Sequence, residues 1–327
     1  MRWRGPWPTM RPGGMEGTMA NTVAKPGAAR AAPAEKAPDK GGMARLSPAL
    51  RAVALASRAL DTLAPEVTAR LMLRHFHRPR SRYRYDYRRL LPPGAERLRL
   101  RYRDLDLTGW RWGRQGPAAL LVHGWEDHSG SMLPLVAPLR HRGYQVFALD
   151  APGHGLSANA ATHLLDCSRA LELMVRTHGP FESIVGHSFG ATAAAILLSR
   201  VPTLCPQRMT MVSPMRDIEQ HLEVFADIAL LSPARTARLR RLLISTLGEP
   251  LSSLSATAAA GRLRIPGLVI HDRHDPVIPH SVGATVARNW AGARLVSTRH
   301  LGHRGVLKSP QVVTEILGFH DRRKPTC

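Results

Sequence analysis

Short segments rich in apolar residues recur along the chain between residues 118 and 296, each separated from the next by enough residues for a helix. Continuous apolar runs of this length are typical of strands that are buried on both faces. Strands that alternate with helices predict a mostly parallel sheet covered by helices on both sides. The expected strands are 118–122, 145–149, 181–185, 209–212, 267–270 and 293–296, and the expected helices are 131–142, 163–178, 191–200 and 310–320.

Two further patterns complete this α/β domain, which we expect to span residues 96–327. Alternating residues at 97–102 and 105–113 predict two strands joined as a meander. Residues 216–262 carry helical patterns and no strand pattern, between two expected strands. An insertion of that kind predicts a short helical cap over a site at the sheet edge.

The N-terminal part of the chain has a different composition. Residues 1–45 are rich in Pro, Gly, Ala and charge, lack periodicity, and are predicted to be disordered. Residues 46–95 are predicted to be a basic helical extension. Within it, 47–77 has apolar residues at helical spacing and predicts one or two amphipathic helices, broken near Pro65. Such helices pack on the domain, dimerise or lie on a membrane, and we favour packing on the domain.

The formal charge of +22 raises the question of a nucleic-acid or membrane partner. The densest basic stretch, HFHRPRSRYRYDYRR at 75–89, interleaves Arg with Tyr, as a nucleic-acid or anionic membrane surface does. Arg is preferred over Lys throughout the chain, which indicates compositional bias and favours a solvated connector. We therefore expect a small-molecule substrate and no nucleic acid, with peripheral membrane contact through the extension left open.

Three widely spaced cysteines, Cys167, Cys205 and Cys327, suit free thiols in a reducing compartment. The sequence contains no apolar run of 18 residues and no pattern of a secretory signal. We therefore expect a cytoplasmic protein.

Polar residues follow the expected strands at their carboxyl ends, where ligands bind in open α/β sheets. One such segment, GHSFG at 186–190, reads G-x-S-x-G and lies between a strand and an Ala-rich helix. This is the context of a nucleophile elbow, in which glycines leave room for a sharp turn at the serine. The other segments are HGWE at 123–126, DAPGHGLS at 150–157, HDRHDPVIP at 271–279 and RHLGHR at 299–304.

Taken together, these segments resemble the serine hydrolases of the α/β-hydrolase fold superfamily. LLVHGW, DAPGHGLS, GHSFG, HDRHDPVIP and LGHRGVL occur in the superfamily's order over about residues 96–322. The chain is most similar to poorly characterised bacterial α/β hydrolases that carry a DAPGHG motif. The resemblance implies an α/β-hydrolase fold and a catalytic triad in the chain order Ser, Asp, His.

The resemblance also assigns roles to individual residues. Ser188 is the expected nucleophile and needs a base within hydrogen-bond reach. His303, in the Gly-His pair after the last strand, is the expected base, and His300 is the alternative. Asp275, in the pattern D-x-x-x-P, is the expected acid that orients the imidazole, and Asp272 is the alternative.

An oxyanion hole is implied at two main-chain N–H groups, those of Trp125 and Phe189. The nearby His123, His154 and His187 are expected to be structural. The cluster of His and Asp at 271–275 is explained by one acid and surface polar residues, so we expect no metal site and no cofactor.

A serine nucleophile argues against the superfamily's dehalogenases and epoxide hydrolases, which use Asp. The cap segment has few aromatic residues and several Leu, Ile and Ala, which suggests an apolar pocket. The sequence therefore predicts a serine hydrolase that cleaves a carboxylic ester or thioester of a small or medium apolar acyl group through an acyl-enzyme. The alternatives are a catalytically silent binding protein, an acyltransferase, a C–C hydrolase or a cofactor-free haloperoxidase.

Overall fold

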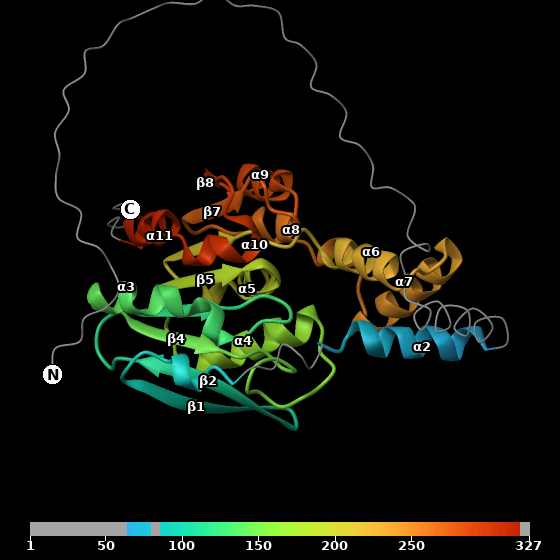
Figure 1. The fold of residues 1–327 in the computed structure, drawn as a ribbon, viewed down its shortest axis with the longest axis horizontal. Coiled ribbons are helices and arrows are strands. Elements are labelled where there is room, and N and C mark those ends of the chain that lie inside the picture. The colour runs from blue at the N-terminus through green and yellow to red at the C-terminus, as the bar shows by residue number, and fades with distance from the viewer. Residues whose placement is uncertain (1–63, 80–85, 321–327) are drawn as a thin grey trace, which may run out of the picture. The chain divides into compact units, whose positions relative to one another are not determined.

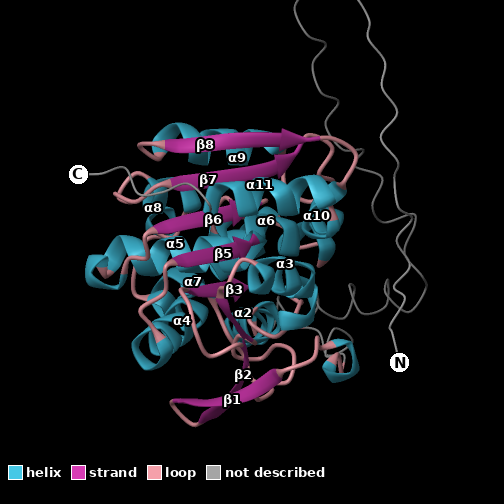
Figure 2. Cartoon of the chain, turned by 90° about the vertical axis from the view of Figure 1, so that its left-hand side faces the viewer, coloured by secondary structure: helices cyan, strands magenta, loops and turns pink. Residues whose placement is uncertain are grey.

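The centre of the computed structural model is an eight-stranded sheet with the order β1-β2-β4-β3-β5-β6-β7-β8 (Figure 2). The structure describes residues 64–79 and 86–320, so the predicted disorder of 1–45 lies outside the described residues. Strand β2 pairs antiparallel with both β1 and β4, and every pair from β4 through β3 to β8 is parallel. The strands are β1 Ala95–Tyr102, β2 Leu105–Trp112, β3 Ala118–Val122, β4 Gln145–Leu149, β5 Ser183–His187, β6 Arg208–Val212, β7 Gly267–Asp272 and β8 Ala293–Thr298.

The apolar runs predicted these strands well, with one displacement. The strands β3 and β4 have the predicted bounds, whereas β5 begins and ends two residues later than the predicted 181–185. From the sequence, Gly186 and His187 were expected in a turn, but both pair with β6 as strand residues. The turn shrinks to a single residue because Ser188 has a positive φ of 50°.

Alternate residues of the central strands enter two separate apolar cores, one on each face of the sheet. In β3, Leu120 and Val122 contribute to the core shared with the first group of helices, and Ala119 and Leu121 to the core shared with the second. The first group is α4 Leu164–His178, α5 Ser188–Arg200, α8 Ala256–Ala260 and α9 His280–Asn289, and the second is η4 Ser129–Leu135, α3 Val136–His141, η7 Val306–Lys308 and α11 Pro310–His320.

Most of the predicted helices are present, and one of them differs in type. The helix expected at 131–142 is a 3₁₀ helix, η4, followed by the short α3. Pro134 lies inside η4 and has no N–H to donate, which accounts for the irregular turn. Helix α11 has the predicted bounds, and α4 begins one residue late because His163 caps it by accepting a hydrogen bond from the N–H of Asp166.

Between β6 and β7 the chain makes a helical excursion from the sheet (Figure 1). It contains α6 Ile218–Ile228, α7 Pro233–Leu247, η6 Leu251–Ser253 and α8. A β-bridge between Asp217 and Ser255 closes its base, and the N–H of Ala256 donates to the carbonyl of Arg216 at 2.8 Å. Helix α8 then packs beside α5 and α9, so only α6 and α7 extend beyond the body of the domain.

The described part of the N-terminal extension is α2 Pro65–Phe76, and the short η3 at Arg88–Leu90 follows it. Helix α2 begins at the predicted break, since proline suits the first turn of a helix. It lies beside α7 (Figure 1), with Glu66 paired to Arg238 at 3.5 Å. This helix therefore packs on the domain, as we favoured from the sequence. Dimerisation and membrane contact of the extension stay predictions.

None of the described helices is long and apolar enough to span a bilayer.

Candidate active site

The strand β5 passes directly into α5 at Ser188, which adopts the left-handed backbone conformation that L residues rarely take. Strain of this kind persists where the surroundings fix it, and it occurs often at functional sites. Gly186 makes the turn possible, because a Cβ there would lie 2.5 Å from the Cα of Ala191. The strand, the strained serine and the helix have the geometry of a nucleophile elbow.

A second glycine brings α5 close to the loop after β3. A Cβ on Gly190 would collide with the carbonyl oxygen of His123. On the other side of this contact, a Cβ on Gly124 would lie 3.2 Å from the Cβ of Ser188. The two glycines therefore let the first turn of the helix and the 123–125 loop meet at the serine.

The structure brings Ser188, His303 and Asp275 together from three separate strand ends. The Oγ of Ser188 lies 3.0 Å from Nε2 of His303, and Nδ1 of the same ring lies 2.7 Å from Oδ2 of Asp275. His303 is in the short helix α10 Gly302–Gly305, and Asp275 follows β7. Both distances lie within the hydrogen-bond range that a nucleophile, a base and an acid that orients the base require.

Asp275 is held as a carboxylate. Its Oδ1 accepts hydrogen bonds from the N–H groups of Val277 and Ile278, at 2.8 and 3.0 Å. Burial acts to raise the pKa of Asp275, but these bonds and the one from His303 outweigh it and lower the pKa to about 2. The carboxylate therefore accepts the Nδ1–H of His303 and leaves Nε2 free to take a proton from the serine.

The two alternative residues lie elsewhere. Asp272 is fully buried and accepts from Thr298 Oγ1 at 2.8 Å and from the N–H of Leu301 at 3.1 Å, so it ties β7 to the loop after β8. His300 is exposed and stacks on His274, with ring centroids 4.0 Å apart. Neither residue takes part in the hydrogen bonds of Ser188.

The other histidines of the motifs brace loops. His123 Nδ1 bonds the carbonyl of Gly124 at 2.7 Å, and its Nε2 accepts from the N–H of Ala151 at 3.0 Å. His154 Nδ1 bonds the carbonyl of Pro152 at 2.9 Å. His187 is buried beside His303 and bonds its carbonyl oxygen. All three make main-chain contacts of the structural kind that the sequence suggested.

The expected oxyanion donors lie on one wall. Phe189 is the second residue of α5, so its N–H is among the first four of the helix, which have no partner within it. Trp125 follows β3, and its ring lies 5.1 Å from the ring of Phe189. The two residues therefore flank Ser188 on the side where the helix meets the loop.

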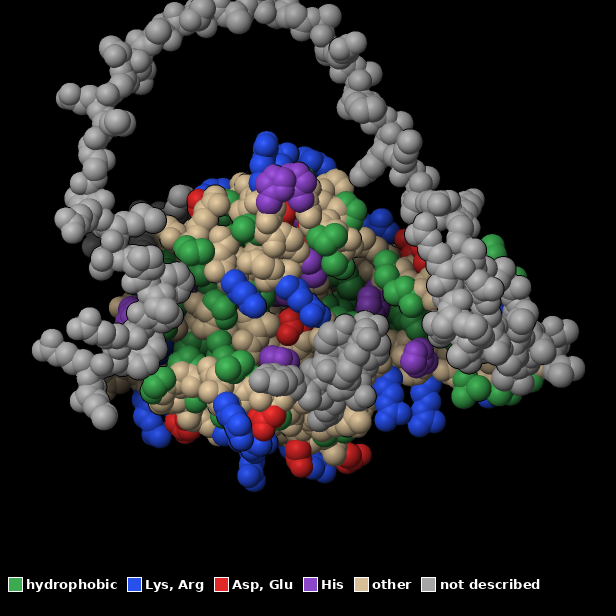
Figure 3. Space-filling model, in the orientation of Figure 1, with side chains coloured by type: hydrophobic (Ala, Val, Ile, Leu, Met, Phe, Trp, Pro, Cys, Tyr) green, Lys and Arg blue, Asp and Glu red, His purple; other side chains and the backbone are tan. Residues whose placement is uncertain are grey.

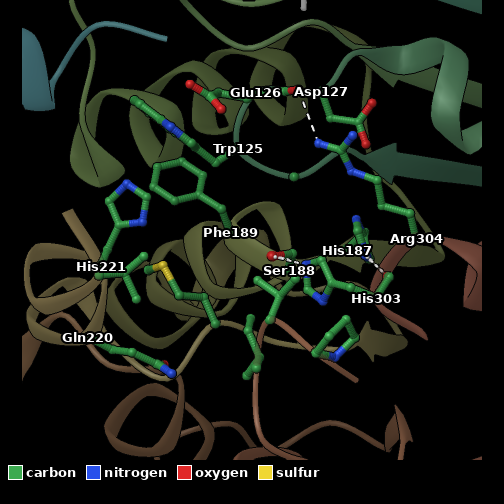
Figure 4. A pocket seen from close by; sticks show the side chains of 16 residues that line it. Trp125, Glu126, Asp127, His187, Ser188, Phe189, Gln220, His221, His303 and Arg304 are labelled. Atoms are coloured by element: carbon green, nitrogen blue, oxygen red, sulfur yellow. Dashed lines mark hydrogen bonds between the residues drawn. The ribbon is translucent and has the colours of Figure 1, made fainter. Parts of the chain in front are cut away.

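A cavity of about 450 Å³ opens above Ser188 (Figure 4). Figure 3 shows histidine and hydrophobic side chains distributed over one face of the molecule, between the charged side chains. Apart from the predicted residues, the sequence patterns missed part of the lining, because nothing in the pattern of α6 tells which of its faces turns toward the serine. The lining residues that lie outside every polar strand-end segment singled out in the sequence are Asp127, Met215, Gln220, His221 and Val224.

Within the described ranges, no group of three or more His, Cys, Asp or Glu side chains is placed to hold a metal ion.

Comparison with known proteins agrees with this geometry. Residues 115–255 match the family model described as "Serine aminopeptidase, S33". The chain is 30% identical over 230 residues to the pimeloyl-[acyl-carrier protein] methyl ester esterase of Xylella fastidiosa (strain M12), covering 68% of this chain and 81% of that protein. It is 25% identical over 236 residues to the protein of the same name from Nitrosomonas europaea, covering 60% of this chain and 92% of that protein.

Among solved structures, the chain is similar to a serine hydrolase involved in carbazole degradation, with a TM-score of 0.53 and 16% identity. The match covers 70% of this chain and all of that one, and it shows a common fold. The mostly parallel sheet, the elbow and the sequence relatives together lead to one assignment. The chain belongs to the serine hydrolases of the α/β-hydrolase fold superfamily and is an esterase-like enzyme.

Proposed function

We propose that Ser188, His303 and Asp275 form the catalytic triad of a hydrolase that cleaves a carboxylic ester or thioester of a small or medium apolar acyl group. The observation that carries the proposal is the continuous hydrogen-bonded path from Ser188 Oγ through the imidazole to Asp275, at 3.0 and 2.7 Å, on the floor of a cavity. The strained backbone of Ser188 supports it further, since it presents Oγ to the cavity.

In the proposed first step, Ser188 Oγ attacks the ester carbonyl carbon while His303 Nε2 takes its proton. The imidazolium that forms is stabilised by the Asp275 carboxylate at Nδ1. His303 then gives the proton to the leaving alcohol or thiol, and the acyl group stays on the serine. Water repeats the attack with His303 as base, which releases the acid and restores the serine.

The negative charge on the carbonyl oxygen needs donors fixed in advance. We propose the main-chain N–H groups of Trp125 and Phe189 for this role. Their placement beside Ser188, and the glycine contacts that bring the loop against the helix, support the assignment. Since the donors are main-chain groups, a change of side chain at either position leaves them in place.

The lining of the cavity bears on the substrate. The side chains of Trp125, Phe189, Met215 and Val224 make much of the wall apolar, which favours an apolar acyl group. The relatives named as methyl ester esterases favour an oxygen ester as the class to test first. We also propose that α6 and α7 act as the cap, because Gln220, His221 and Val224 reach the cavity from α6.

The direct test is labelling with a fluorophosphonate probe followed by peptide mass spectrometry. We expect one adduct, on Ser188, that is absent from Ser188→Ala and strongly reduced in His303→Ala. A screen of p-nitrophenyl esters and matched thioesters by acyl length then defines the substrate class. An adduct on another serine, or none on folded protein, would overturn the proposed triad.

A further inference from the structure

Two polar side chains enter the apolar wall of the cavity from the first turn of α6. Gln220 and His221 follow Asp217, which caps the helix by accepting from the N–H of Gln220 at 2.7 Å. Both side chains line the cavity above Ser188, and Figure 4 shows the imidazole of His221 beside Trp125 and Phe189.

These side chains have unused hydrogen-bonding capacity. Gln220 Oε1 is buried and has no hydrogen-bond partner among the described residues. The ring nitrogens of His221 form no hydrogen bond with any residue in the described part of the chain. Buried polar atoms are paired in the great majority of cases, so the unpaired Oε1 of Gln220 asks for an explanation. Because this atom lies at the wall of a substrate cavity, the most direct explanation is that it bonds a polar group of the ligand.

The imidazole is held in place by aromatic rings. Its centroid lies 5.4 Å from the ring of Trp125, 6.5 Å from that of Phe189 and 5.2 Å from that of Phe76. Phe76 belongs to α2, so the N-terminal helix backs the cavity wall through this contact. Side chains fixed by packing in this way are suited to recognition, because little conformational freedom is lost on binding.

The charge of the site limits what it can recognise. Burial lowers the pKa of His221 to about 4, against the opposing effect of Glu126, so the ring is neutral at neutral pH. A neutral imidazole and a carboxamide each offer donors and acceptors without charge. Glu126 lines the same cavity and repels a carboxylate, while Arg304 lies on the opposite side of the cavity from His221 (Figure 4).

We propose that Gln220 and His221 form a polar subsite for an uncharged hydrogen-bonding oxygen, a hydroxyl or oxo group, on the acyl chain of the substrate. The inference rests on the proposed function, because it concerns the acyl group transferred to Ser188. It narrows the substrate class from apolar acyl esters to esters of hydroxy or oxo acids.

The test compares p-nitrophenyl esters of straight-chain acids with esters of the same acids that carry one hydroxyl group, moved stepwise along the chain. We expect the full-length protein to prefer the hydroxy ester at one position by about ten-fold in kcat/KM, as one net hydrogen bond provides. His221→Phe keeps the ring volume and removes both nitrogens, so it should slow the hydroxy ester more than the plain ester and bring this ratio to about one.

Two further variants make the test specific. Gln220→Met preserves the length of the side chain and should also reduce the ratio. His75→Phe is the matched control, because His75 is exposed on α2, packs on Phe225 and lies outside the cavity lining. It makes the same chemical change and should leave the ratio as in the unmodified protein.

The outcomes separate the inference from the function on which it rests. Cleavage of plain esters with no preferred hydroxyl position overturns the polar subsite and leaves the triad intact. The subsite is also overturned if His221→Phe slows both esters of a pair equally, since that is the effect of a structural residue. Failure to cleave any ester, with Ser188 unlabelled by the fluorophosphonate, overturns the proposed function and the subsite with it.

Discussion

His187 Nε2 lies 2.9 Å from the main-chain carbonyl oxygen of His303, and the two rings lie 4.9 Å apart. Burial, together with the neighbouring His303, lowers the pKa of His187, so its ring is neutral. Its Nδ1 has no hydrogen-bond partner among the described residues, so the Nε2–H donates to the carbonyl. The residue before the proposed nucleophile thus fixes the backbone of the proposed base.

Replacement of His187 tests this positioning role. We expect His187→Ala to lower the free energy of unfolding by about 1–3 kcal/mol, since it removes a buried imidazole and leaves the carbonyl of His303 without its donor. It should also lower kcat more than it raises KM, because His303 loses its support. Urea unfolding and steady-state kinetics measure both. His187→Gln keeps an N–H donor and should recover part of kcat; a Gln variant no better than Ala would argue against positioning.

Asp272 at the end of β7 and Asp275 just after it should differ sharply in their effect on catalysis. Asp275→Asn loses the acceptor for the Nδ1–H of His303, and we expect kcat to fall by roughly 10⁴-fold, as in other triads with the wrong tautomer. Asp272→Asn is the matched control. It weakens the bonds to Thr298 and Leu301, so it should lower stability while costing much less in kcat. Equal losses of kcat would contradict the assignment of Asp275.

The parallel sheet was predictable because its strands are buried on both faces. Residues 118–122 and 146–149 are continuous apolar runs, which are typical of short strands buried on both faces. The displacement of β5 has a local cause. Gly186 and His187 look like turn residues by type, but the positive φ of Ser188 confines the turn to one residue.

The candidate triad was predictable in outline because each member follows a strand and the carboxyl ends of parallel strands meet at one edge. The choice between His303 and His300 depended on the resemblance. The two residues lie three positions apart after the same strand, and the sequence does not tell which side chain points toward the serine. The cavity lining was harder still. His221 and Phe76 meet across α6 and α2, and their contact depends on how two amphipathic helices pack, which the spacing of apolar residues leaves open.

Buried neutral histidines should make the fold sensitive to mild acid. Burial lowers the pKa of both His77 and His221 to about 4 from 6.5. Between these values the unfolded chain binds more protons than the folded one, so the free energy of unfolding falls as the pH falls from about 6.5 to 4. His221→Phe should make this slope shallower by up to about 1.4 kcal/mol per pH unit. Urea titrations at stepped pH measure it, and an unchanged slope would contradict the burial of a neutral ring.

The close approach of α5 to the loop after β3 gives a last prediction. Gly190→Ala places a methyl group against the carbonyl oxygen of His123, and both sides of the contact are buried main chain with little room to move. We expect a loss of about 1–3 kcal/mol in the free energy of unfolding. Fluorophosphonate labelling of Ser188 should slow as well, because the helix and the loop carry the two proposed oxyanion donors.

Gly318→Ala is the matched control for this change. Gly318 lies in α11, is exposed, and a Cβ there meets nothing within 4 Å among the described residues. Alanine in the exposed last turn of this helix should raise stability by up to about 1 kcal/mol and leave the labelling rate unchanged. If Gly190→Ala behaved like Gly318→Ala, the helix and the loop would have room to separate. The rigid placement of the Trp125 and Phe189 N–H groups around the oxyanion would then lose its structural basis.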